Sequence, residues 1–172
     1  MSTTPVKLTN ATDAWVDQAT PTSAKGTTGT LLYASDIATK GKRSYLYYTL
    51  PFPRGVTIIS AKLRLTQYTA MIGTFNVTVN RCISSWSATT VTWNTRPSGA
   101  GSGSTTLTKS NPAASTVWEW DVTSQLQSVS SGAAWYGFLI SCDSTVGTFR
   151  AHSPQSTTLA YRPVLEVSWK EN

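Results

Sequence analysis

Residues 60–68, which read SAKLRLTQY, alternate between apolar and polar side chains. Successive side chains of an extended chain point to opposite faces, so Ala61, Leu63 and Leu65 share one face and the basic residues between them share the other. One face therefore suits a hydrophobic core, whereas the other suits water. The pattern predicts a strand of an antiparallel sheet.

The same alternation recurs along the chain in short segments separated by residues that favour turns. The simplest arrangement makes 75–80 the antiparallel neighbour of 60–68. About eight to ten short strands without long helices predict an all-β fold, an antiparallel jelly-roll β-sandwich that occupies 1–172 as one domain. The expected strands are 14–17, 30–34, 43–50, 60–68, 75–80, 90–93, 117–122, 136–142, 145–151 and 163–169.

A short helix is expected directly after the strand at 117–122. Residues 122–129 place apolar side chains at helical spacing. Asp121 or Thr123 can serve as the N-cap and Gly132 as the terminator, so one or two helical turns are predicted.

Two polar segments separate the middle strands. Residues 84–97 contain many turn formers, and their two tryptophans are expected to cover the end of the core. Residues 99–108 are rich in Gly, Ser and Thr and lack periodicity, which predicts a surface loop.

The composition gives the chain few charges and a positive balance. Charged residues make up 13% of the chain, and the formal net charge is +6, which favours a polyanionic partner such as an acidic polysaccharide. The one basic cluster, Lys40, Lys42 and Arg43, is predicted to be a solvated loop. No basic and aromatic stripe follows one element, so nucleic acid is not an expected partner. No apolar stretch is long enough to span a membrane.

The two cysteines, Cys82 and Cys142, lie in apolar or alternating segments and lack the spacing of a metal site. We expect buried thiols, with a disulfide between two strands as the alternative. Residues 1–8 contain one lysine and no long apolar run, so no signal peptide is predicted. The chain is expected to be made in the cytoplasm and either kept there or released by lysis.

Several blocks of sequence, in one order, resemble the DNRLRE-domain family, whose relatives include carbohydrate-binding modules, some of which bind alginate. The resemblance covers nearly the whole chain and implies a jelly-roll β-sandwich without a catalytic centre. Similar modules in bacteriophage tail and other virion proteins imply a phage particle as the location. The blocks are AWVDQATPTSAKGTTGTL (14–31), RSYLYYTLPFPRGVTIISAKLRL (43–65), RCISSWSATTVTWNTRPS (81–98), WEWDVTSQLQSV (118–129), YGFLI (136–140) and YRPVLEVSW (161–169).

Residues suited to catalysis are scarce. His152 is the only histidine and accompanies no nucleophile motif, so we interpret it as a loop residue. Glu119 and Asp121 share one strand face about 7 Å apart, a separation that inverting glycosidases use. Asp121 is more simply the cap of the following turn, and no catalytic residue is predicted.

Acidic residues near the ends of the early strands offer a calcium site. Asp13, Asp17 and Asp36 could supply carboxylate oxygens to a structural Ca²⁺, which would be the only cofactor. The alternative is that each carboxylate accepts hydrogen bonds from backbone amides in its own turn.

Sugar-binding β-sandwiches use exposed rings that stack on the apolar faces of sugars. Alternation assigns Trp118, Trp120 and Trp169 to the core, and the family blocks assign structural roles to Trp86 and Trp93. The remaining candidates for contact with a glycan or a partner are Trp15, Trp135, Tyr45 and Tyr47, with Arg43 and Arg150 as basic contacts. For Tyr45 and Tyr47, packing is favoured over stacking on a ligand.

Two functions are expected from these observations. The first is a structural or adhesion component of a phage virion, on the tail or the capsid exterior, that contacts other virion proteins or copies of itself and attaches to surface polysaccharide. The alternative is a free-standing carbohydrate-binding module, outside the cell or at its surface, that recognises an acidic polysaccharide.

Overall fold

The computed structural model describes residues 4–26, 29–100 and 103–172. Residues 101–102 of the expected loop at 99–108 lie outside the described residues. The described part is all-β with one short helix, as predicted, and it also contains one 3-10 turn. Its elements are β1 (Val6–Leu8), β2 (Thr12–Asp17), β3 (Leu31–Ala34), β4 (Lys42–Tyr47), β5 (Thr57–Thr66), β6 (Thr74–Arg81), β7 (Thr105–Ser110), β8 (Val117–Asp121), α1 (Thr123–Ser130), β9 (Phe138–Cys142), β10 (Phe149–His152), η1 (Leu159–Tyr161) and β11 (Val164–Lys170).

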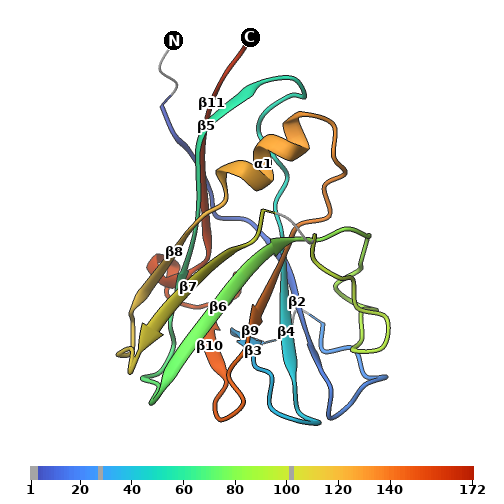
Figure 1. Cartoon of the computed structure of the whole chain (residues 1–172), viewed down its shortest axis with the longest axis vertical. Coiled ribbons are helices and arrows are strands. Elements are labelled where there is room, and N and C mark those ends of the chain that lie inside the picture. The colour runs from blue at the N-terminus through green and yellow to red at the C-terminus, as the bar shows by residue number, and fades with distance from the viewer. Residues whose placement is uncertain (1–3, 27–28, 101–102) are drawn as a thin grey trace.

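The strands form two large antiparallel sheets and one small one (Figure 1). One large sheet has the order β1-β11-β5-β8, the other has the order β2-β4-β9-β6-β7, and β10 pairs with β3. The main core lies between the sheets and includes the fully buried rings of Trp118 and Trp120. The Trp120 indole on β8 donates a hydrogen bond of 2.9 Å to the Val77 carbonyl on β6, which ties the two large sheets together.

The expected pairing of 60–68 with 75–80 is wrong. These segments form β5 and β6, which belong to different sheets, and β5 pairs with β11 and β8 instead. Both strands do bury one face, because they lie on opposite sides of the same core. Alternation reports which face is buried but does not report which strand is the neighbour.

Two of the strand expectations also need correction. The segment 90–93 forms no strand and lies between two turns, the second of which is closed by hydrogen bonds between Thr92 and Thr95. The expected loop at 99–108 contains most of β7, an edge strand whose hydroxyls meet those of β6, as in the 2.7 Å contact between Thr78 Oγ1 and Thr106 Oγ1.

The helix α1 completes one edge of β5. Beyond the stretch that pairs with β8, the amides of Ile58 and Ala61 donate hydrogen bonds of 2.8 and 2.9 Å to side chains of α1. The N-cap residue is Val122 and makes no side-chain cap bond, so neither expected N-cap holds that position. Asp121 still accepts a 2.9 Å hydrogen bond from the Thr123 amide. Gly132 follows the helix end with a φ of +115°, as expected of a terminator.

Both cysteines are free and buried, so the expectation of buried thiols is confirmed. Burial raises the pKa of Cys82 to about 12 and that of Cys142 to about 11. His152 is the last residue of β10, so its interpretation as a loop residue is wrong. Among the described residues, no helix has the length and apolar character required to cross a membrane.

Candidate functional site

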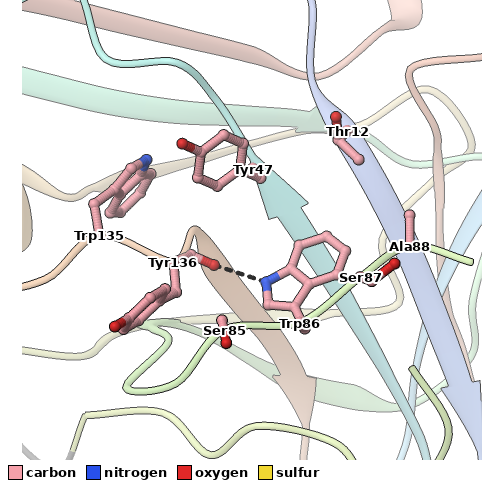
Figure 2. Close-up of a pocket in the computed structure, with 8 residues that line it drawn as sticks. All are labelled: Thr12, Tyr47, Ser85, Trp86, Ser87, Ala88, Trp135 and Tyr136. Atoms are coloured by element: carbon pink, nitrogen blue, oxygen red, sulfur yellow. Dashed lines mark hydrogen bonds between the residues drawn. The ribbon is translucent and has the colours of Figure 1, made fainter. Parts of the chain in front are cut away.

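An open groove with aromatic walls lies over one end of β2 and β4. Its volume is about 420 Å³, and its walls come from β2, β4, the segment after β6 and the segment before β9 (Figure 2). We call this feature the aromatic groove. The residues that line it are Thr12, Tyr47, Ser85, Trp86, Ser87, Ala88, Trp135 and Tyr136.

Trp86 is held from behind by a second, smaller cluster of buried residues. This outer cluster lies on the face of the five-stranded sheet that points away from the main core, where the segment after β6 covers the strands. The Trp86 indole donates a 2.7 Å hydrogen bond to the Tyr136 carbonyl (Figure 2), and its ring lies 5.4 Å from the buried Tyr45 ring. The outer cluster comprises Ala14, Val16, Tyr45, Cys82, Val91 and Leu139.

Trp135 and Tyr47 form the opposite part of the aromatic groove. The Trp135 indole donates a 2.8 Å hydrogen bond to the Tyr48 carbonyl, and its ring packs edge-on against Phe138 at 4.9 Å. The Tyr47 ring lies 6.3 Å from the Trp135 ring and is 37% exposed. Both indole N–H groups of the aromatic groove are therefore used inside the protein, which fixes the rings before any ligand arrives.

The chemistry of the aromatic groove is that of stacking and neutral hydrogen bonding. Rings supply apolar faces, and hydroxyls of Thr12, Ser85 and Ser87 can donate to or accept from a ligand. None of the described lining residues is charged. An open site of rings with a few hydroxyls suits a ligand with both apolar faces and many hydroxyl groups, which describes a sugar chain.

The structure brings two of the predicted contact residues together. Tyr47 and Trp135 both line the aromatic groove, whereas Tyr45 is fully buried and donates a 3.2 Å hydrogen bond to the Pro97 carbonyl. Tyr45 therefore cannot contact a glycan, although it supports Trp86. Alternation placed Tyr45 and Tyr47 on one face, but the segment after β6 covers only the first.

The other predicted contact residues lie outside the aromatic groove. Arg43 pairs with Asp36 at 2.8 Å and lies over the Trp93 ring at 5.6 Å, which binds the covering segment to β4. Trp15 contacts the Tyr33 ring at 4.6 Å, and Arg150 is exposed on β10.

Sequence reasoning missed the contributions of Trp86, Tyr136 and Thr12 to the aromatic groove. Trp86 was assigned a structural role, and it does have one through the outer cluster, but its ring also borders the opening. In the sequence, only the turn-forming residues around Trp86 indicated that this residue lies outside a strand, where its ring can border a groove.

The predicted calcium ligands do not come together. Asp17 forms an ion pair with Lys42 at 2.7 Å, and Asp36 forms one with Arg43 at 2.8 Å. Asp13 is buried, and burial raises its pKa to about 6 against the opposing effect of a hydrogen bond from Gln155. In residues 4–26, 29–100 and 103–172, no group of three histidine, cysteine or acidic side chains is arranged to hold a metal ion.

The acidic pair Glu119 and Asp121 has the electrostatics of structural carboxylates. Hydrogen bonds from Lys62 and Arg64 lower the pKa of Glu119, and hydrogen bonds from Thr123 lower that of Asp121. A glycosidase needs one carboxylic acid whose pKa is raised so that it can protonate the leaving group. This pair lacks such an acid.

An open, uncharged groove of fixed rings on an antiparallel β-sandwich is a feature typical of sugar-binding modules. The family comparison identifies the type. A family model for carbohydrate-binding module family 96 matches residues 4–169, so the chain belongs to that family. No curated protein matches the sequence.

Proposed function

We propose that this chain is a non-catalytic module that binds a polysaccharide by stacking sugar rings in the aromatic groove. The observation that carries the proposal is the arrangement of Trp86 and Trp135, whose indole N–H groups are bound to backbone carbonyls while their rings border an open groove. Fixed rings lose little conformational entropy on binding, which favours affinity for an otherwise well-hydrated ligand. Membership of carbohydrate-binding module family 96 supports the same function.

An acidic polysaccharide was expected because of the positive charge of the chain, and this charge lies outside the aromatic groove. The net charge of +6 motivates this expectation, but the uncharged lining gives the groove no means of selecting an anion. We therefore assign stacking on apolar sugar faces to the aromatic groove. Binding there should change little with salt, because salt screens charges and does not weaken stacking.

A glycan array of neutral and acidic polysaccharides, followed by titration calorimetry on the best neutral ligand, tests this function. Tyr47→Ala removes an exposed wall of the groove and should weaken binding about tenfold, since a stacked ring contributes roughly 1–2 kcal/mol. Tyr68→Ala is the matched control, because Tyr68 is 46% exposed and lies outside the groove. Equal affinity of Tyr47→Ala and the parent for the neutral ligand would show that the aromatic groove is not the binding site.

The location in a phage virion, and the alternative at a cell surface, remain predictions. The same holds for contacts with other virion proteins and for self-association. Carbohydrate binding is compatible with either location, since a phage exterior and a cell surface both meet surface polysaccharides. Mass spectrometry of purified particles and of the culture medium distinguishes the two locations. Detection of the protein only in the medium would contradict a location in the virion.

A further inference from the structure

A second hollow lies beside the aromatic groove. It is open to solvent, and its volume is about 370 Å³. All of its lining residues belong to the segment between β6 and β7. We call this feature the hydroxyl pocket, because four of the residues that line it carry a hydroxyl group. The lining consists of Ser85, Trp86, Ser87, Thr90, Val91 and Thr95.

The hydroxyl pocket and the aromatic groove share part of their lining. Ser85, Trp86 and Ser87 border both features (Figure 2 labels all three). The Trp86 ring is fixed at this border by its hydrogen bond to the Tyr136 carbonyl and by its contact with the buried Tyr45 ring. The two features are therefore neighbours on one surface, with Trp86 at their common border.

Two turns shape the hydroxyl pocket. In the first turn, the amides of Thr90 and Val91 donate hydrogen bonds of 3.1 and 2.9 Å to the Ser87 carbonyl. In the second turn, the Thr92 amide donates a 3.0 Å hydrogen bond to the Thr95 hydroxyl. Val91 is 3% exposed and belongs to the outer cluster, which attaches this stretch to the five-stranded sheet. The hydroxyl pocket is thus formed before any ligand arrives, which lowers the entropic cost of binding.

Two hydroxyls of the hydroxyl pocket are available to a ligand. Ser85 and Thr90 are exposed, and neither side chain makes a hydrogen bond within the described part of the chain. By contrast, the Ser87 hydroxyl contacts that of Thr89 at 3.1 Å. A free hydroxyl can donate one hydrogen bond and accept others, as the hydroxyl groups of a sugar also do.

The hydroxyl pocket offers nothing that would select an anion. None of its described lining residues is charged. Arg96, which follows Thr95, lies over the Trp93 ring at 3.8 Å and donates a hydrogen bond to the Trp93 carbonyl. A carboxylate in the hydroxyl pocket would lose water without gaining an ion pair, which is unfavourable. The lining therefore favours neutral sugar units, as the lining of the aromatic groove does.

Each of the two features is small by itself. Ligand pockets in proteins have volumes of about 300–1,000 Å³. The aromatic groove, with about 420 Å³, and the hydroxyl pocket, with about 370 Å³, both lie near the lower end of that range. Joined at Trp86, they suit a longer ligand. Because both are open, a chain can pass through them without having its ends enclosed.

We propose that the hydroxyl pocket is a second subsite of the glycan site. The ligand is then an internal stretch of a neutral polysaccharide, which runs from the aromatic groove past Trp86 into the hydroxyl pocket. Sugar rings stack in the groove, and the hydroxyl groups of the following units form hydrogen bonds with Ser85 and Thr90. This second subsite rests on the proposed function, to which it adds the charge and the length of the ligand.

Titration calorimetry with cello-, manno- and xylo-oligosaccharides, each from the disaccharide to the hexasaccharide, tests the proposal. The affinity should rise with length, because only a longer chain reaches from the aromatic groove to Thr90. Thr90→Val keeps the shape of the side chain and removes its hydroxyl. It should weaken hexasaccharide binding about three- to tenfold and disaccharide binding much less. Tyr47→Ala should weaken binding at every length.

Thr157→Val is the matched control, because Thr157 is exposed and lines neither feature. It should bind every oligosaccharide like the parent. Amide NMR spectra provide a second measurement that does not depend on a variant. The hexasaccharide should shift the amide signals of Thr90 and Thr95, which the disaccharide should leave unchanged. Melting curves establish that each variant is folded.

The contrary outcomes separate the second subsite from the proposed function. If affinity does not rise with length while Tyr47→Ala weakens binding, the aromatic groove is the whole site and the proposed function stands. If affinity rises but Thr90→Val binds the hexasaccharide like the parent and the Thr90 amide does not shift, the chain continues elsewhere. If none of the three series binds, the second subsite is rejected, and the proposed function fails with it unless the glycan array finds another neutral polysaccharide.

Discussion

Asp13 and Tyr48 are two buried polar residues with unpaired oxygens in the described structure: Asp13 Oδ1 and the Tyr48 hydroxyl have no hydrogen-bond partner there. Burial raises the pKa of Tyr48, and the negative charge of Asp13 raises it further. Asp13 directly follows Thr12 in β2, and Tyr48 directly follows Tyr47 at the end of β4, so both residues lie next to side chains that line the aromatic groove. This arrangement favours a neutral Asp13.

Asp13 should make the protein less stable as the pH rises. Its pKa is about 6 in the folded state and about 3.8 as the ordinary value, so folding favours the protonated form. The contribution is fully present below pH 3.8 and is lost as the pH rises through 6, a loss on the order of 3 kcal/mol. Asp17, Glu119 and Asp121 act in the opposite direction, because their pKa values are lowered.

Asp13→Asn isolates this effect, because it removes the titration of Asp13 and leaves the other carboxylates in place. Urea unfolding of the variant between pH 4 and pH 8 should show a smaller fall in the free energy of unfolding than the parent shows. Glu171→Gln, which changes an exposed acid, should follow the parent curve. Identical pH dependence of Asp13→Asn and the parent would mean that Asp13 is charged in the folded protein throughout this range.

The hydrogen bond between Trp120 and Val77 should be important for stability. Trp120→Phe removes the indole donor of this bond between the sheets and opens a small cavity in the core. We expect a loss of about 2–4 kcal/mol in the free energy of unfolding, measured by urea denaturation. Tyr68→Phe, a change at an exposed ring, should alter stability by less than about 0.5 kcal/mol. A similarly small effect of Trp120→Phe would show that the bond between the sheets is dispensable.

The thiols should be unreactive in the folded protein. Cys82 and Cys142 are buried, and burial raises both pKa values, so little thiolate forms near neutral pH and a reagent has poor access to it. An aromatic disulfide reagent should titrate no thiol in the native protein and both after denaturation. Fast labelling of the native state would reveal an opening of the outer cluster or of β9, where these residues lie.

Alternation was sufficient to predict the sandwich because burial of one face depends only on the residues of the strand itself. The β5 segment was therefore found, whereas its neighbours β11 and β8 were not, because strand order depends on contacts distant in sequence. For the same reason, only part of the lining of the aromatic groove was predicted. Tyr47 and Trp135 were candidates, but the Trp86 wall depends on how the segment after β6 folds over the sheet.

The partners of the early carboxylates could not be predicted from the sequence either. Asp17 binds Lys42 and Asp36 binds Arg43, and both pairs form because β2, β3 and β4 come together in the fold. In sequence, Lys42 and Arg43 only looked like part of a solvated basic cluster. Once these cations are in place, the charges of two predicted calcium ligands are already compensated.

Gly137 should be indispensable to both stability and the aromatic groove. It follows Trp135 and Tyr136 directly, has a φ of +87°, and accepts a 2.9 Å hydrogen bond from the Cys82 amide. A Cβ at this position would overlap the Leu46 carbonyl oxygen on the neighbouring strand, and backbone cannot move aside as a flexible side chain can. Gly137→Ala therefore combines a disfavoured backbone conformation with a clash, and should cost about 3 kcal/mol or more in the free energy of unfolding.

Gly55→Ala provides the matched control, because Gly55 has a φ of +85° but nothing within 4 Å of the added Cβ. It should lose only the backbone cost of roughly 1 kcal/mol. The difference between the two variants in thermal or urea denaturation measures the clash with Leu46. If Gly137→Ala folds and is no less stable than Gly55→Ala, β4 and the start of β9 are not packed as closely as the structure shows. Its affinity for a neutral polysaccharide should then match the parent, since Trp135 and Tyr136 would keep their places.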